Sequence, residues 1–151
     1  MIKRSLFIIL LFGCTLNLAA FDAIGHKIIA DIAYENLNCL ARKKVDKLLG
    51  KRGMIYTSSW SDNIKSDSRY AYSYNWHFQN LREGMTKEAL CKLYENPKSE
   101  GQFLFYALDS LNRNLKNKKG GGEDVKFIVH LMGDMFQPLH LGRLADRGGN
   151  D

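Results

Sequence analysis

Apolar and polar residues follow helical spacing along most of the chain. Ile28, Ile29 and Ile32 recur in this way, which predicts a helix near the N-terminus. A second apolar run follows Asn38 and stops at Gly50, a residue type that commonly ends helices. Two consecutive helices are therefore expected in the first third of the chain.

Further helices are predicted in the second half. A short one ends near Asn96, and a longer amphipathic run spans residues 101–116. After a charged, glycine-rich loop, a strongly apolar helix runs from Glu123 to about Gln137. It ends there because Pro138 cannot continue a helix.

The remaining pattern gives no convincing pair of strands. Aromatic residues crowd the segment from Tyr70 to Leu81, which is expected to be extended or irregular. The chain has 151 residues, of which 45% are hydrophobic and 25% charged, a composition that excludes disordered and low-complexity proteins. The sequence therefore predicts one mostly α domain.

The first twenty residues have the anatomy of a secretory signal peptide. Lys3 and Arg4 precede an apolar run that is too short to span a bilayer, and the segment ends in small residues up to Ala20. We expect residues 1–20 to be removed, so that residues 21–151 form the mature domain in the periplasm or outside the cell. An alternative is a lipid anchor on Cys14.

The net charge and the cysteine content indicate little about the function of the chain. Loss of the two basic residues near the N-terminus lowers the formal charge from +6 to +4, a surplus that many proteins carry without binding nucleic acid. Cys39 and Cys91 could form a disulfide bond or be two buried apolar side chains, and their spacing does not decide between these. Because no Cys-x-x-Cys motif occurs, nitrogen and oxygen atoms would have to hold any metal ion.

The strongest candidate for chemistry is the pair His130 and Asp134. Their spacing places both side chains on one face of the last predicted helix, where they could share an ion. Taken alone, the pair could equally be a buried hydrogen bond between the two side chains. His140 follows closely, beyond the proline, and adds another imidazole that suits Zn²⁺.

Weaker candidates lie upstream. Asp62 and Lys65 are about one helical turn apart, and His77 lies between two aromatic residues. His26 follows a glycine close to the expected mature N-terminus. Taken alone, Asp62 is more typical of a helix cap and His77 of core packing than of a functional site.

Together the candidates resemble a known family. The motifs FDAIGH, WSDNIK, WHF and HLMGDMFQPLH, followed by DRGGN, occur here in the order and spacing of S1/P1-type nucleases. Members of that family are secreted, mostly helical enzymes with three zinc ions that cut single-stranded nucleic acids, and they are distantly similar to bacterial zinc-dependent phospholipases C. The resemblance runs from Phe21 to Asp151 and implies a single helical domain of the phospholipase C/single-strand nuclease type.

The resemblance also implies a set of zinc ligands. One zinc ion would be held by Asp62, His77, His130 and Asp134, with the last of these bridging to a second ion. That second ion would also be bound by His26 and by the free amine and carbonyl oxygen of Phe21.

The third zinc ion of the family would use His140 together with a later histidine and aspartate. The chain printed here stops at Asp151 and has no histidine after His140, so the third site has one ligand. The chain is therefore either a truncated form of a longer protein or a remnant with an incomplete third site.

Substrate contacts are implied by the same resemblance. Lys65 would face the developing negative charge, Phe78 would stack on an unpaired base, and Asn80 stands where fungal members use an aspartate to bind the base. The expected activity is zinc-dependent hydrolysis of single-stranded DNA or RNA to 5′-nucleotides, together with removal of 3′ phosphates.

Two other functions remain possible from the sequence. A phospholipase C-like enzyme could use the same zinc cluster on a different phosphodiester. A non-catalytic, zinc-stabilised remnant would account for the incomplete third site. In every case we expect a monomer without a transmembrane segment.

Overall fold

The computed structural model describes residues 23–143, except for the side chains of residues 99–100. No strand occurs in this range, in which the one β-type pairing is an isolated bridge between Leu81 and Arg143. The prediction of a mostly α fold is therefore confirmed. The elements in chain order are α2 (Ala23–Glu35), α3 (Cys39–Leu49), α4 (Gly53–Tyr56), α5 (Trp60–Asn63), η1 (Ser68–His77), α6 (Lys87–Glu95), η2 (Pro97–Glu100), α7 (Leu104–Lys116), α8 (Gly122–Met135) and η3 (Pro138–Leu141).

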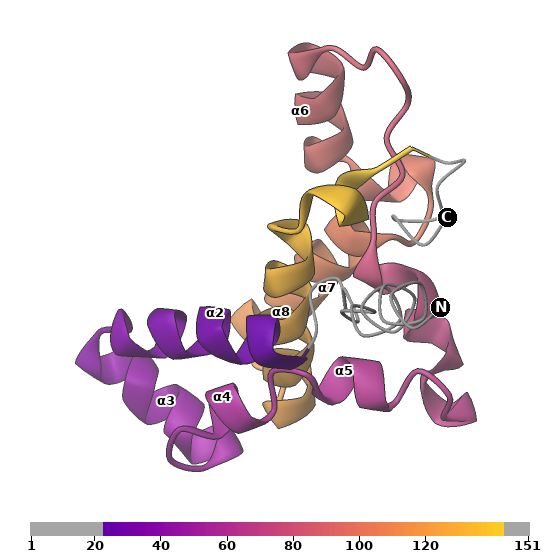
Figure 1. Cartoon of the computed structure of the whole chain (residues 1–151). Helices are drawn as coiled ribbons and strands as arrows, with labels where there is room; N and C mark the ends of the chain where they lie inside the picture. The colour runs from indigo at the N-terminus through magenta and orange to yellow at the C-terminus, as the bar shows by residue number, and fades with distance from the viewer. Residues whose placement is uncertain (1–22, 144–151) are drawn as a thin grey trace, which may run out of the picture.

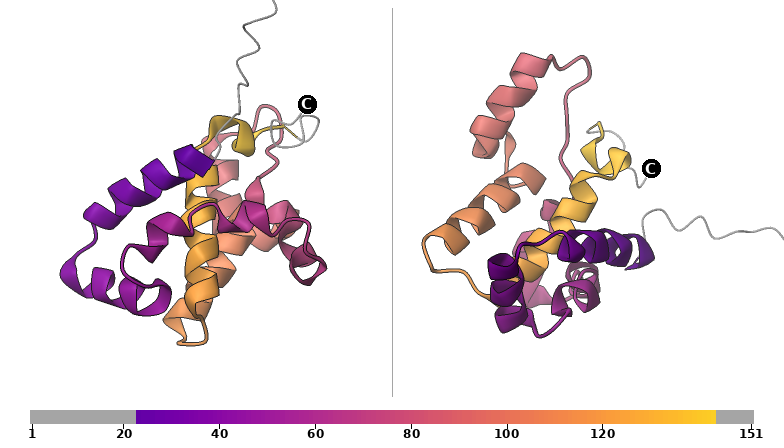
Figure 2. Two further views of the ribbon diagram at one scale, coloured as in Figure 1. Left: turned by 60° about the horizontal axis from the view of Figure 1, so that its bottom comes forward. Right: turned by 90° about the vertical axis from the view of Figure 1, so that its left-hand side faces the viewer.

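Helix α8 is the central element of the fold. It packs against α7 along its length and also contacts α2, α3, α5 and η1 (Figure 1). Helix α2 crosses α8, and α3 and α4 lie together beneath α2 (Figures 1 and 2). Helix α6 projects from the other end of the molecule. The elements that carry His26, Asp62, His77 and His140, namely α2, α5, η1 and η3, therefore all contact α8.

The core lies on the face of α8 that meets α7 and η1. Phe127 is almost completely buried, and the rings of Trp60 and Trp76 meet it edge-on at centroid distances of 5.2 and 5.1 Å. Leu104 and Leu131 are fully buried beside this group. These contacts fix α5 and the aromatic segment to α8.

The aromatic segment differs from the prediction up to His77, whereas residues 78–80 have no regular secondary structure, as expected. Residues 68–77 form a 3₁₀ helix rather than an extended or irregular stretch. Asp67 caps it, because its side chain accepts a hydrogen bond from the backbone N–H of Arg69 at 3.0 Å. The rings of Tyr70 and Trp76 then pack on Phe127 and hold the turns in place.

The buried face of α2 also differs from the apolar pattern that predicted the helix. The buried side chains are those of His26, Ala30 and Tyr34. Ile28 and Ile32, which marked the helix in the sequence, are both largely exposed. The tyrosine is held by a hydrogen bond from its hydroxyl to the carboxylate of Asp46 on α3 at 3.0 Å.

Other sequence-based expectations have mixed outcomes. Cys39 and Cys91 are free and exposed, so they are neither bridged to each other nor buried. Within residues 23–143 the structure contains no helix with the length and apolar content needed to cross a bilayer. The segment 1–20, with Cys14, lies outside the described residues.

Truncation of the central aromatic residue should test the core. Phe127→Ala removes a buried ring and is expected to lower the free energy of unfolding by about 3–5 kcal/mol. Phe136→Ala is the matched control: that ring is 70% exposed, and the expected change is below about 0.5 kcal/mol. Urea denaturation of both variants measures the difference. Equal losses would show that Phe127 is not the centre of the core.

Candidate metal centre

Imidazole and carboxylate groups from four elements meet at the C-terminal half of α8. His26 comes from the first turn of α2, Asp62 from α5 and His77 from the last position of η1. His130 and Asp134 lie one turn apart on the same face of α8, as their spacing predicts. All except Asp62 are buried.

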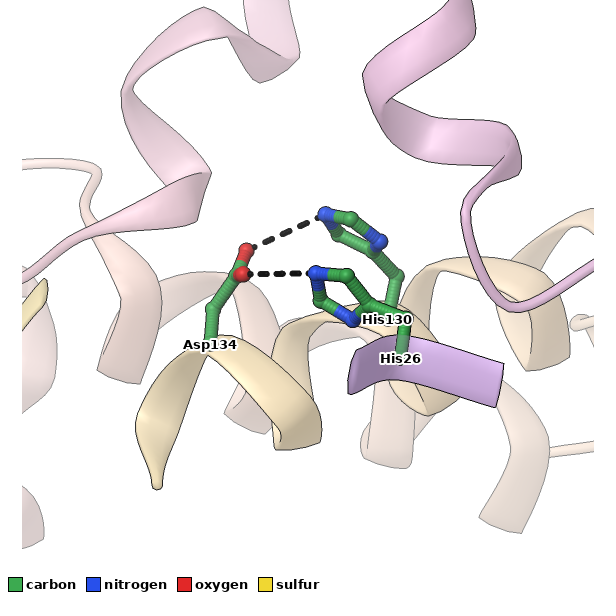
Figure 3. Close-up of side chains that lie close together, drawn as sticks. All are labelled: His26, His130 and Asp134. Atoms are coloured by element: carbon green, nitrogen blue, oxygen red, sulfur yellow. Dashed lines mark ion pairs between the residues drawn. The ribbon is translucent and has the colours of Figure 1, made fainter. Parts of the chain in front are cut away.

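Asp134 lies in the middle of this cluster. Its Oδ1 is 3.3 Å from Nε2 of His26, and its Oδ2 is 3.2 Å from Nε2 of His130 (Figure 3). The two imidazole rings stack with their centroids 3.9 Å apart. Each carboxylate oxygen thus faces a different imidazole, an arrangement suited to a carboxylate that bridges two ions.

A second group forms around the same ring nitrogen of His130. Its Nε2 lies 3.0 Å from Nδ1 of His77 and 3.4 Å from Oδ1 of Asp62. The same Nδ1 of His77 is 3.7 Å from Oδ1 of Asp62. It is also 3.0 Å from Oδ2 of Asp134. Four candidate donor atoms therefore surround one small volume.

The spacing of these atoms fits zinc. Zn²⁺ binds nitrogen and oxygen at about 2.0–2.1 Å, so neighbouring ligands of a tetrahedral ion lie roughly 3.3 Å apart. The nitrogen–oxygen separations of 3.0 to 3.7 Å around His77 and His130 lie near that value. The donor set, with imidazoles and carboxylates only, is also one that zinc accepts.

Neighbouring groups orient the imidazoles. The Nδ1 of His130 lies 2.8 Å from the carbonyl oxygen of Ser58. A carbonyl oxygen can only accept, so Nδ1 carries the proton and Nε2 of the neutral ring presents its lone pair to the cluster. The hydroxyl of Ser61 lies 3.2 Å from Nε2 of His77 and leaves Nδ1 of that ring facing the cluster.

Sequence reasoning did not identify the two serines. Ser61 precedes Asp62 directly, so its place in the WSDNIK motif was an available signal. The contribution of Ser58 is a backbone carbonyl, which no side-chain pattern reveals.

Burial and hydrogen bonding shift the pKa values of Asp134, Asp62 and His130 in opposite directions. Burial alone would raise the pKa of Asp134, but hydrogen bonds from the three surrounding imidazoles outweigh it and lower that pKa well below the usual range. Asp62 behaves likewise, with a lowered pKa, because His130 and Lys65 outweigh its burial. Burial would lower the pKa of His130, but hydrogen bonds to the two carboxylates raise it to about 9. Burial lowers the pKa of His77.

The other predicted site residues lie near the cluster or outside the described range. Nε2 of His140 is 3.6 Å from Oδ1 of Asp134. Nζ of Lys65 is 2.7 Å from Oδ1 of Asp62. Phe21 lies outside the described residues, as do residues 144–151.

The two predicted base contacts follow His77 directly along the chain. The ring of Phe78 packs against that of Phe103 at a centroid distance of 5.4 Å. The Oδ1 atom of Asn80 is buried and has no hydrogen-bond partner within the described part of the chain. The backbone of this segment is fixed, because Gln79 N–H donates to the carbonyl oxygen of His140 at 2.8 Å.

Comparison with known proteins decides the family. The model of the S1/P1 nuclease family matches residues 21–151. The chain belongs to the S1/P1 nuclease family. The matched region includes all five residues of the cluster, His26, Asp62, His77, His130 and Asp134.

Individual relatives from plants and fungi agree with this assignment. The chain is 28% identical to Endonuclease 2 of Arabidopsis thaliana over an alignment of 146 residues, which covers 89% of this chain and 50% of the relative. It is 25% identical to Nuclease S1 of Aspergillus oryzae over 134 residues, covering 84% of this chain and 46% of the relative. For Nuclease P1 of Penicillium citrinum the identity is 25% over 138 residues, with 86% and 50% covered. The chain thus spans about half the length of the curated relatives it matches.

The interactions of His130 with Asp62 and Asp134 predict that the stability of the chain without bound metal depends on pH. The folded pKa of His130 is raised from 6.5 to about 9, so its stabilising effect is complete below pH 6.5 and is lost as the pH rises through about 9. We expect the Tm of the chelator-treated chain to fall across this interval.

A variant provides the control for this dependence. Asp62→Asn removes one of the two carboxylates that face His130 and should make the fall in Tm shallower. Thermal denaturation followed by circular dichroism measures both chains. An identical pH dependence with and without the substitution would contradict the coupling.

Proposed function

We propose that this chain is the metal-binding part of a zinc-dependent nuclease that hydrolyses phosphodiester bonds in single-stranded nucleic acids. The observation that carries this proposal is the buried carboxylate of Asp134 between two imidazoles, each facing one of its oxygens. Membership of the S1/P1 nuclease family supports the nuclease activity. The expected products are 5′-nucleotides, and removal of 3′ phosphates is expected at the same site.

Two ions are assigned to the cluster. Asp62, His77, His130 and Asp134 would hold the first, and Asp134 would share the second with His26 and with the backbone amine and carbonyl oxygen of Phe21. Zinc at these positions would supply an activated water and neutralise charge on the phosphate. The free amine is a feasible ligand near neutral pH, because its ordinary pKa is about 7.7–8.0.

The third ion is assigned to His140. Its backbone N–H donates to the carbonyl oxygen of Gln137 at 3.0 Å, and its carbonyl oxygen accepts from Gln79, so the ring is held beside Asp134. The other ligands of this ion would have to come from outside residues 23–143.

Residues of this chain also bind and orient the substrate in the proposal. Lys65 neutralises charge as a flexible cation, and its ion pair with Asp62 keeps its ammonium group at the edge of the cluster. Phe78 offers an aromatic face to an unpaired base, which explains the preference for single strands, because a base in a duplex is already stacked and paired. Asn80 offers amide hydrogen bonds where an aspartate could only accept.

The proposed location follows from the N-terminal pattern. We assign residues 1–20 to a signal peptide and place the mature protein in the periplasm or outside the cell. Cleavage after Ala20 would create the amine that the second ion needs.

Substitution of the shared imidazole tests the cluster. His130→Ala is expected to lower the zinc affinity more than about 100-fold and to abolish hydrolysis of denatured DNA. Tyr74→Ala, at a side chain that is 64% exposed, is the control and should leave both unchanged. Metal analysis after dialysis and release of acid-soluble nucleotides are the measurements. Unchanged zinc content in His130→Ala would refute its assignment as a ligand.

The role of the terminal amine is tested separately. A chain that begins at Phe21 should bind its second zinc ion more tightly than a chain with one alanine added before it, because the extension moves the amine away from His26. Phe21→Trp keeps the backbone ligands and should bind as tightly as the unsubstituted chain. Equal zinc binding by the extended chain would remove Phe21 from the ligand set.

A further inference from the structure

The hydroxyl of Ser61 lies behind one of the candidate zinc ligands. Ser61 is almost completely buried in α5, and its Oγ is 3.2 Å from Nε2 of His77. Within residues 23–143 this is the one hydrogen-bond contact of the hydroxyl, and it is also the one hydrogen-bond contact of Nε2. The two groups therefore depend on each other for hydrogen bonding.

The other nitrogen of the same ring faces the metal centre. Nδ1 of His77 is 3.0 Å from Oδ2 of Asp134 and 3.0 Å from Nε2 of His130. A neutral imidazole has one lone pair, so Nδ1 can bind an ion only when the ring carries its proton on Nε2. The Nε2–H group is then a buried donor that needs an acceptor, and the Oγ atom of Ser61 is in position to accept from it.

A hydroxyl is better suited to this position than a carbonyl oxygen. In the absence of an ion, the carboxylate of Asp134 favours a proton on Nδ1 of His77, because a carboxylate only accepts. The serine hydroxyl can donate to Nε2 in that form of the ring and accept from Nε2–H in the other. The carbonyl oxygen of Ser58 leaves no such choice to His130, because it can only accept from Nδ1 of that ring. The hydroxyl of Ser61 therefore matches both forms of His77.

The packing of α5 fixes the position of Ser61. The residue before it, Trp60, meets the ring of Phe127 on α8 edge-on at a centroid distance of 5.2 Å. The residue after it, Asp62, is a candidate ligand whose Oδ1 lies 3.4 Å from Nε2 of His130. The short helix therefore brings one ligand, and the hydroxyl behind another ligand, to the site together.

We propose that Ser61 is a positioning residue for the first zinc ion. Its hydroxyl accepts the Nε2–H of His77 and keeps the lone pair of Nδ1 directed at Asp62, His130 and Asp134. The same hydrogen bond makes the imidazole a more basic ligand. This inference rests on the proposed zinc site, and its tests measure metal binding and the position of a proton rather than hydrolysis.

Removal of the hydroxyl tests the inference. In Ser61→Ala, one of the stepwise zinc affinities is expected to fall about tenfold or more, because the bound ring loses the acceptor for its Nε2–H. Ser73→Ala is the matched control. Ser73 is also a buried serine, and its hydroxyl donates to the carbonyl oxygen of Tyr70 at 2.8 Å, away from the cluster. Its zinc affinities should change by less than about twofold, since no ligand loses a partner. Competition with a chromophoric chelator measures both variants and the unsubstituted chain.

Nuclear magnetic resonance of the unsubstituted chain locates the proton directly and does not depend on the folding of either variant. With isotope-labelled histidine and bound zinc, Nε2 of His77 is expected to show the shift of a protonated nitrogen and Nδ1 that of a metal-bound nitrogen. A proton on Nδ1 would overturn the inference, as would equal changes in zinc affinity for Ser61→Ala and Ser73→Ala. An unsubstituted chain that binds no zinc would instead contradict the zinc site itself, so the two failures are distinguishable.

Discussion

Mutual compensation of buried charge is the constraint on which this structure depends. Asp134 is almost completely buried, and a lone carboxylate in that position would be costly. Three imidazoles, carried by α2, η1 and α8, surround it. Their nitrogen atoms lie 3.0 to 3.3 Å from its carboxylate oxygens. Helix α8 supplies His130 and Asp134, and Phe127 and Leu131 on the same buried side of this helix belong to the core. The same helix therefore contributes to the hydrophobic core and to the candidate metal site. A shift in its position would disturb both.

Most of the fold was predictable because its helices are long and periodic. The helix from Glu123 was expected from its apolar run, acidic start and following proline, and α8 ends close to the predicted residue. The 3₁₀ helix at residues 68–77 was not, because it depends on the cap at Asp67 and on rings docking on a distant helix. The buried face of α2 was missed for a different reason. Ile28 and His26 both lie on rows of apolar residues, and sequence alone does not say which row packs inward.

The candidate site was predictable in part. His130 and Asp134 share a helix, so their spacing alone placed them on one face. His77 and Asp62 come from separate elements, and only the resemblance to a family joined them to the pair before the structure was known. Their convergence is a tertiary effect, fixed by packing on α8. The carbonyl of Ser58, which sets the proton position on His130, has no sequence signature.

The order of the donor groups along the chain has a thermodynamic consequence. His26 lies in the first described helix and Asp134 near the end of the last α-helix, so an ion held by both would close a loop that includes most of the polypeptide. A cross-link of that length removes many conformations from the unfolded chain, as a disulfide between distant cysteines does. Metal bound only in the native state adds its binding free energy to folding. Within residues 23–143 both cysteines, Cys39 and Cys91, are free, so a shared ion would be the cross-link that restricts the unfolded form of this part of the chain.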